Sequence, residues 1–153
     1  MSDHRKAQAE REANVVWQGN LQDGQGMILD VTSAAFANLP VSWASRSQNP
    51  DGQTSPEELL AAAHAACYAM ALSHELAGRN APPQQLEVRA RVGFDPKVGG
   101  GFEVSFSRLT VHAQVEGITP EQFDEAARQA AEGCPISAAM KGNVEITVRP
   151  TLT

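Results

Sequence analysis

The feature that most constrains the fold is one segment of 25 residues, 55–79, which reads SPEELLAAAHAACYAMALSHELAGR. Ser55 as N-cap, Pro56 at the first helical position and Glu58 at the third form a capping box, so a helix begins here. Gly78 and the two prolines that follow soon after it end the helix. Its interior holds many alanines and few polar side chains, unlike a surface helix with a single apolar stripe. The segment therefore predicts a central helix that other elements surround closely on most sides.

The residues before this helix predict a small amount of β-structure. Residues 13–20 and 25–31 have the composition of short strands, and a turn around Asp23 and Gly24 would join them into a hairpin. Residues 34–54 contain Pro40, Pro50 and Gly52, which interrupt regular structure. We expect a loop there with at most one short strand.

The residues after the helix predict three strands and a second helix. Residues 85–94 alternate strictly between apolar and polar, as in a half-exposed strand. In residues 102–115 the apolar parity changes near Ser107 and Arg108, which predicts a β-bulge that keeps both halves facing the core. A capping box from Thr119 to Gln122 starts a helix that ends at Gly133, and a short helical turn and the strand NVEITVRP follow.

This order of elements favours an α+β fold in which an antiparallel sheet packs on the long central helix. An all-parallel sheet is disfavoured, because its buried strands would be continuous apolar runs. We expect residues 1–9 to form a flexible tail and residues 10–153 to form a single domain.

Composition excludes several classes of function. The chain has 153 residues, a net charge of −6 and 12 Lys and Arg that are scattered singly. No basic stripe is present to neutralise a phosphate backbone, so we expect no nucleic-acid partner. The polar start and the lack of an 18-residue apolar run predict no membrane segment and a cytoplasmic protein.

Cys67 and Cys134 are the two cysteines of the chain. Two thiols in a cytoplasmic protein are not a disulfide framework, so if they pair, the pairing is catalytic. Cys67 lies among alanines, where a buried thiol usually acts as a small hydrophobic residue. Cys134 precedes a helical turn, whose N–H groups and dipole would lower its pKa. From the residues alone, Cys134 is the better placed to be ionised.

If Cys67 is the nucleophile, it needs a cation, because burial by itself raises a thiol pKa. Arg46 is the only Lys or Arg between Glu12 and Gly78. Glu57 lies at the second position of the helix and could hold that guanidinium in bidentate fashion. However, the ten residues from Glu57 to Cys67 rise about 15 Å along a straight helix. Either the helix breaks, or Glu57 and Arg46 serve the Cys67 of a second subunit in an obligate dimer.

A metal site is the main alternative chemistry on this helix. His64 and Cys67 are three residues apart and would share a face, and His74 lies further along. No further ligand has a recognisable spacing, and His64 is equally consistent with a packed, hydrogen-bonded histidine. No phosphate-binding or dinucleotide-binding motif is present, so we expect neither metal nor cofactor.

The segments SPEELLAAAHAACYAMALSHELA and AARQAAEGCPISAAMKGNVEITV resemble the OsmC/Ohr family of organic hydroperoxide peroxidases, and more closely its OsmC branch. Weaker similarity extends over nearly the whole chain. The resemblance implies an intertwined homodimer with its active sites at the interface. It also implies that Cys67 is the peroxidatic cysteine, Cys134 the resolving cysteine, Arg46 the partnering arginine and Glu57 the residue that orients it.

The resemblance thus implies an oxidoreductase with peroxide as acceptor. Cys67 would reduce an organic hydroperoxide and become a sulfenic acid, and Cys134 would form a disulfide with it. The resemblance implies a dithiol of the lipoyl type as the reductant of the pair. The alternative is a stress-related binding module in which both cysteines are inert.

Overall fold

The computed structural model describes residues 5–153, which divide into two compact units, one ending at Ser55 and one beginning at Pro56. The tail expected over residues 1–9 falls partly on residues 1–4, which lie outside the described part of the chain. Residues 5–12 have no regular secondary structure. That the two units form one domain stays a prediction.

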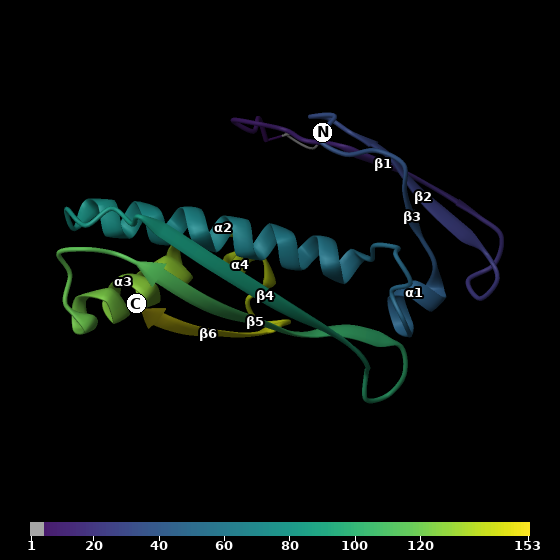
Figure 1. Ribbon diagram of the computed structural model, residues 1–153. Coiled ribbons are helices and arrows are strands. Elements are labelled where there is room, and N and C mark those ends of the chain that lie inside the picture. Colours follow the sequence, from purple (N-terminus) through teal and green to yellow (C-terminus); the bar gives the residue numbers. More distant parts are fainter. Residues whose placement is uncertain (1–4) are drawn as a thin grey trace. The chain divides into compact units, whose positions relative to one another are not determined.

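The first unit contains a three-stranded antiparallel sheet in the order β1-β2-β3 (Figure 1). β1 spans Ala13–Gln18, β2 spans Gln25–Val31 and β3 spans Leu39–Val41. The predicted hairpin and the short third strand are confirmed. The unit has almost no core of its own, since Ile28 is the only one of its described hydrophobic side chains that is fully buried.

A short helix in this unit, α1 at Trp43–Ser47, was expected to be a loop. Ser42 caps it, and the side chain of Ser45 completes a capping box with Ser42. Serine replaces the usual Glu or Gln of that motif, and the helix has only five residues, so neither its motif nor its length gave a signal. Arg46 therefore lies in the last turn of a helix.

The second unit is organised around α2, Pro56–Gly78, which is continuous over 23 residues as predicted (Figure 1). Its buried apolar residues, Tyr68, Leu72 and Leu76, recur every four positions and face the core. The opposite face is exposed and mostly apolar: besides His74, its exposed members are Ala62, Ala63, Ala66, Met70 and Ala77. Within the second unit, α2 is therefore covered on one side only.

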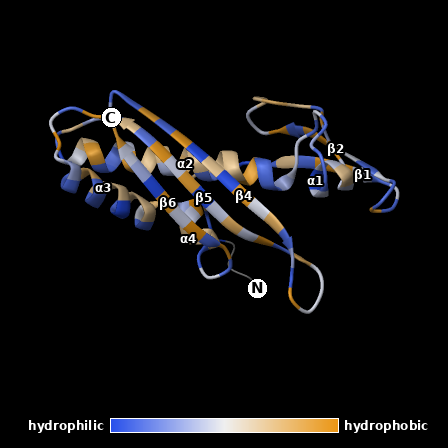
Figure 2. Ribbon diagram, turned by 60° about the horizontal axis from the view of Figure 1, so that its bottom comes forward, coloured by the Kyte–Doolittle hydropathy of each residue, from blue (hydrophilic) through white to orange (hydrophobic). Residues whose placement is uncertain are grey.

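The second sheet has the order β4-β5-β6, with β4 at Gln85–Pro96, β5 at Phe102–Gln114 and β6 at Glu145–Leu152. Alternating hydrophilic and hydrophobic residues run along its strands (Figure 2). The α+β class is confirmed, but β6 runs parallel to β5, so this sheet is not antiparallel throughout. The chain between these two strands contains α3, Pro120–Gly133, and α4, Pro135–Met140, which is long enough for a parallel crossover.

The predicted bulge is present, slightly before its expected place. Val92 pairs with Ser107 and Phe94 with Val104, so β5 has one extra residue opposite Gly93. A Cβ on Gly93 would lie 2.6 Å from the Ser105 hydroxyl oxygen and closer still to the Phe106 ring. Glycine is therefore required opposite the bulge.

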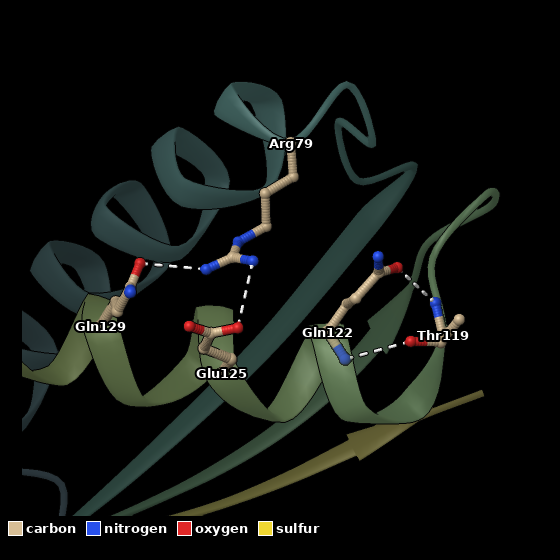
Figure 3. Close-up of polar contacts among 5 residues, drawn as sticks. All are labelled: Arg79, Thr119, Gln122, Glu125 and Gln129. Atoms are coloured by element: carbon tan, nitrogen blue, oxygen red, sulfur yellow. Dashed lines mark hydrogen bonds and ion pairs between the residues drawn. The ribbon is translucent and has the colours of Figure 1, made fainter.

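Helix α3 begins with the predicted capping box: the Gln122 backbone N–H donates to the Thr119 hydroxyl, and the Thr119 N–H donates to the Gln122 side chain (Figure 3). Arg79, just after α2, reaches across to α3, where it donates to Gln129 and pairs with Glu125 at 3.6 Å. The buried residues of β5, α2 and α3 form one core, so both helices cover the same face of the sheet.

The other face of this sheet gathers basic residues from all three strands. Arg89, Arg91, Arg108 and Arg149 line an open cavity of about 530 Å³. Arg108 also stacks on Phe106, 3.8 Å from the ring centre. The basic residues are scattered along the sequence, but the fold gathers these four on one face, so the expectation that no basic cluster is present is wrong here. The absence of a nucleic-acid partner stays a prediction.

Candidate active site

The two cysteines, 67 positions apart in the sequence, meet in the second unit. Cys67 lies on α2, and Cys134 is the residue at which α3 ends and α4 begins. Their sulfur atoms are 3.1 Å apart, within hydrogen-bond range, and both thiols are free. A modest approach of the sulfurs would form a disulfide, whose S–S bond is about 2.05 Å long.

Cys134 is the more acidic of the two thiols. It is fully buried, and burial by itself would raise its pKa. Nearby donor groups, namely the Ser137 hydroxyl, the backbone N–H groups of Ser137 and Ile136 and the Cys67 thiol, outweigh that effect and lower the pKa of Cys134. The expectation that Cys134 is better placed to be ionised agrees with this environment.

Cys67 has the opposite tendency. Burial raises the pKa of its thiol, and the neighbouring Cys134 raises it further, although a backbone N–H of Ile136 partly compensates. These opposite directions favour an anion on Cys134 over an anion on Cys67. A thiolate on Cys67 would need a positive charge in addition to these contacts.

His64 lies one turn before Cys67 on α2 and is fully buried. Its Nδ1 is 2.6 Å from the Ser107 hydroxyl of β5, and its Nε2 is 2.7 Å from the Ser137 hydroxyl of α4. Burial lowers the pKa of His64, so the ring is neutral at neutral pH. Both ring nitrogens are therefore engaged by serines.

This arrangement does not favour the metal alternative. Residues 5–153 contain no group of three or more His, Cys, Asp or Glu arranged to hold a metal ion. His74 is exposed, whereas His64 is buried.

Ser107 and Ser137 are the site residues that the sequence analysis missed. Both are buried, and both lie within hydrogen-bond distance of the same imidazole. Ser107 belongs to the alternate residues of β5 whose side chains face the core after the bulge. A polar residue at such a core-facing position is the one signal that could have identified it. Ser137 has no comparable signal in its short helix.

Tyr68 follows Cys67 in α2 and, like His64, is fully buried. Its hydroxyl donates to the backbone carbonyl of Ala127 at 2.9 Å. Burial raises the pKa of Tyr68, and the nearby Cys134 raises it further. Tyr68 therefore stays protonated and ties α2 to α3.

Glu57 and Cys67 belong to the same unbroken helix, so the expected separation of about 15 Å along its axis holds. The possibility of a break between them is thereby removed. Glu57 is buried, with 7% of its surface exposed. Arg46 is half-buried on α1 in the other unit. Their roles, and the Ser55–Glu58 capping box, stay predictions.

The site defines a class of α+β protein in which a cysteine of a long alanine-rich helix lies 3.1 Å from a second free cysteine. The family model for OsmC-like protein matches residues 49–149. The chain belongs to this OsmC-like family. It is 34% identical to peroxiredoxin OsmC of Escherichia coli over 146 residues, which cover 95% of this chain and 96% of that protein.

Two further similarities concern one protein of Bacillus subtilis. The chain is 32% identical over 99 residues to the organic hydroperoxide resistance protein OhrB, covering 63% of this chain and 70% of OhrB. The crystal structure of OhrB matches with a TM-score of 0.68 at 24% identity over 92% of this chain and 98% of that one, which supports the fold. No helix within residues 5–153 is long and apolar enough to cross a membrane.

Proposed function

We propose that this protein is a thiol-dependent peroxidase that reduces organic hydroperoxides to alcohols. The observation that carries the proposal is the distance of 3.1 Å between two free cysteine sulfurs from separate elements. Relatives named for peroxiredoxin activity and for organic hydroperoxide resistance support the same chemistry.

The reaction takes three balanced steps. The Cys67 thiolate attacks the terminal oxygen of ROOH, the O–O bond breaks, and protonation of the leaving alkoxide gives ROH and a Cys67 sulfenic acid. Cys134 then attacks that sulfur, which forms the disulfide and releases water. A dithiol reductant of the lipoyl type restores both thiols by exchange and is itself oxidised to a disulfide.

Arg46 supplies the positive charge that Cys67 lacks within its own unit, and Glu57 fixes the guanidinium. The pKa of Cys67 is raised in its present surroundings, so a thiolate there requires such a cation. The same charge would stabilise the alkoxide as it leaves. Because Glu57 and Cys67 are far apart on one helix, Glu57 and Arg46 act on the Cys67 of a partner subunit.

The active protein is accordingly a homodimer. The exposed apolar face of α2, with Met70 72% exposed, is a surface that a second copy would remove from water. The first unit exposes Val15, Val16 and Trp17 on β1 and buries very little of its own apolar surface. Burial of these two surfaces against a second chain would remove their apolar side chains from water and stabilise the dimer.

A thiol count tests the chemistry directly. Reduced protein treated with one equivalent of cumene hydroperoxide should lose two free thiols per chain without a crosslink between chains. Cys134→Ser should instead retain a sulfenic acid on Cys67 that dimedone traps. Retention of both thiols would reject the peroxidase and favour a binding module with inert cysteines. If dimedone instead labels Cys134 in Cys67→Ser and does not label Cys67 in Cys134→Ser, then Cys134 is the peroxidatic cysteine and Cys67 the resolving one.

Subunit mixing tests whether the site is shared. Arg46→Gln and Cys67→Ser should each lack activity, but unfolding and refolding them together allows mixed dimers to form. If Arg46 acts on the partner, half of the dimers carry one intact site, and about a quarter of the wild-type activity returns. If it acts within its own chain, no activity returns. Glu57→Gln mixed with Cys67→Ser applies the same test to Glu57.

Oligomeric state gives an independent measurement. Ala66→Glu places a charge in the exposed apolar face of α2 and should yield monomers in light scattering, with loss of thermal stability. Thr110→Glu, a similar change on the exposed face of β5, is the matched control and should leave the dimer intact. A stable, folded wild-type monomer would contradict the shared site.

A further inference from the structure

His64 is a buried ionisable residue that the peroxidase chemistry does not use. Three elements meet at its ring, since α2 carries it, β5 supplies Ser107 and α4 supplies Ser137. A neutral imidazole donates from one nitrogen and accepts at the other, so its two serine neighbours have opposite roles. Which serine donates depends on what lies beyond them.

Beyond Ser137 lies Cys134, the N-cap residue of the same short helix, and the Ser137 hydroxyl is the group that most lowers the pKa of its thiol. A serine hydroxyl has one proton to donate, and an ionised sulfur can only accept. When Cys134 is a thiolate, Ser137 must therefore donate to it and accept from the Nε2–H of His64. The Nδ1 of His64 is then the acceptor of the Ser107 proton, so every donor in the chain points towards the sulfur.

We propose that His64 is a positioning residue for Cys134: it donates to Ser137, which commits the Ser137 hydroxyl proton to the sulfur and favours the Cys134 thiolate. The step that benefits rests on the proposed function, because a resolving cysteine attacks the sulfenic acid as a thiolate. The new S–S bond replaces the S–O bond of Cys67, and the departing oxygen leaves as water with the proton that Cys134 gave up.

The backbone N–H groups of Ser137 and Ile136 and the neutral Cys67 thiol also lower the pKa of Cys134, but no charged side chain nearby does so. From α2, Cys67 and Tyr68 face it, and a negative charge on either would oppose a thiolate. The charged residues that line the cavity beside Ser137, of about 440 Å³, are exposed to solvent: Arg128, Glu132 and Lys141. Solvent screens these charges. The serine and histidine chain is thus a buried contribution that these charged side chains do not duplicate.

The test titrates Cys134 alone, in a Cys67→Ser background, by thiolate absorbance at 240 nm and by alkylation rate against pH. His64→Leu removes the donor and should raise the Cys134 pKa by about one unit, a tenfold loss of thiolate at fixed pH. His64→Gln can present an amide N–H near the Nε2 position and should restore most of the ionisation. A purely structural role predicts equal stability losses without a change in this pKa.

Ser107→Ala is the second variant, and it covers the case in which His64→Leu does not fold. Without Ser107 the imidazole is free to adopt the other tautomer, whose Nε2 would accept the Ser137 proton, so the Cys134 pKa should again rise. An unchanged pKa in folded His64→Leu or Ser107→Ala protein would overturn the proposal. The titration uses no peroxide, so its result does not depend on the result of the thiol count. Failure of this inference can therefore be distinguished from failure of the proposed function.

Discussion

Formation of the Cys67–Cys134 disulfide should raise the stability of the protein by an amount that the structure sets. The bond would close a loop between positions 67 residues apart. Loop-closure entropy for that length corresponds to about 4 kcal/mol at 25 °C. This is an upper value, because the sulfurs must still approach from 3.1 Å to about 2.05 Å, and any strain in α2 or α4 subtracts from it.

For a chain of this size, about 4 kcal/mol corresponds to a rise in Tm of roughly 8–16 °C. The assay compares thermal unfolding of fully reduced protein with protein oxidised by one equivalent of cumene hydroperoxide, with free thiols counted in each sample. Cys134→Ser treated identically is the control and should show no rise. An oxidised sample without free thiols that melts at or below the reduced sample would show that the two sulfurs cannot bond without distorting their helices, and would refute the reasoning.

Three further predictions concern the surroundings of the site. Tyr68→Phe removes a buried hydrogen bond and should lower the free energy of unfolding by about 1 kcal/mol in urea titration, with peroxide reduction retained; no loss would show that the hydroxyl is dispensable. Gly93→Ala should cost about 1–3 kcal/mol because its Cβ would meet the Phe106 ring, whereas Gly78→Ala, with open space around it, should change stability by less than 1 kcal/mol. Equal melting of the two variants would contradict this difference. Burial lowers the pKa of His64, so the unfolded chain binds a proton that the folded one does not. Stability should therefore fall as the pH drops below about 6.5, and His64→Gln should show a smaller fall in a series of melts.

Local signals in the sequence predicted most elements correctly. The Thr119 capping box, the ends of α2 and α3, the first hairpin and the alternation of β4 all appear where their residues indicated. Each was predicted from a local signal, namely a capping box, a turn residue or a periodicity, that a few neighbouring positions display directly. The helix α1 was missed because its capping residues are both serine and its length is only one turn.

Those local signals could not predict the direction of β6 or the cluster of arginines on the second sheet. A strand's alternation is the same whether its neighbour is parallel or antiparallel, so the sequence did not reveal that β6 runs parallel to β5. Arginines that are far apart in the sequence meet because three strands present the same parity to one side. The register between strands decides such neighbours.

The sequence by itself determined the helix that carries Cys67, the turn that holds Cys134 and the local reason for a lowered Cys134 pKa. Only the tertiary structure decided that the two sulfurs lie 3.1 Å apart and that serines 43 and 73 positions from His64 bind its two nitrogens. The physical reason is range: capping and periodicity act within a turn or two of chain, whereas the ionisation of a buried thiol depends on which distant donors the packing of the core brings to it.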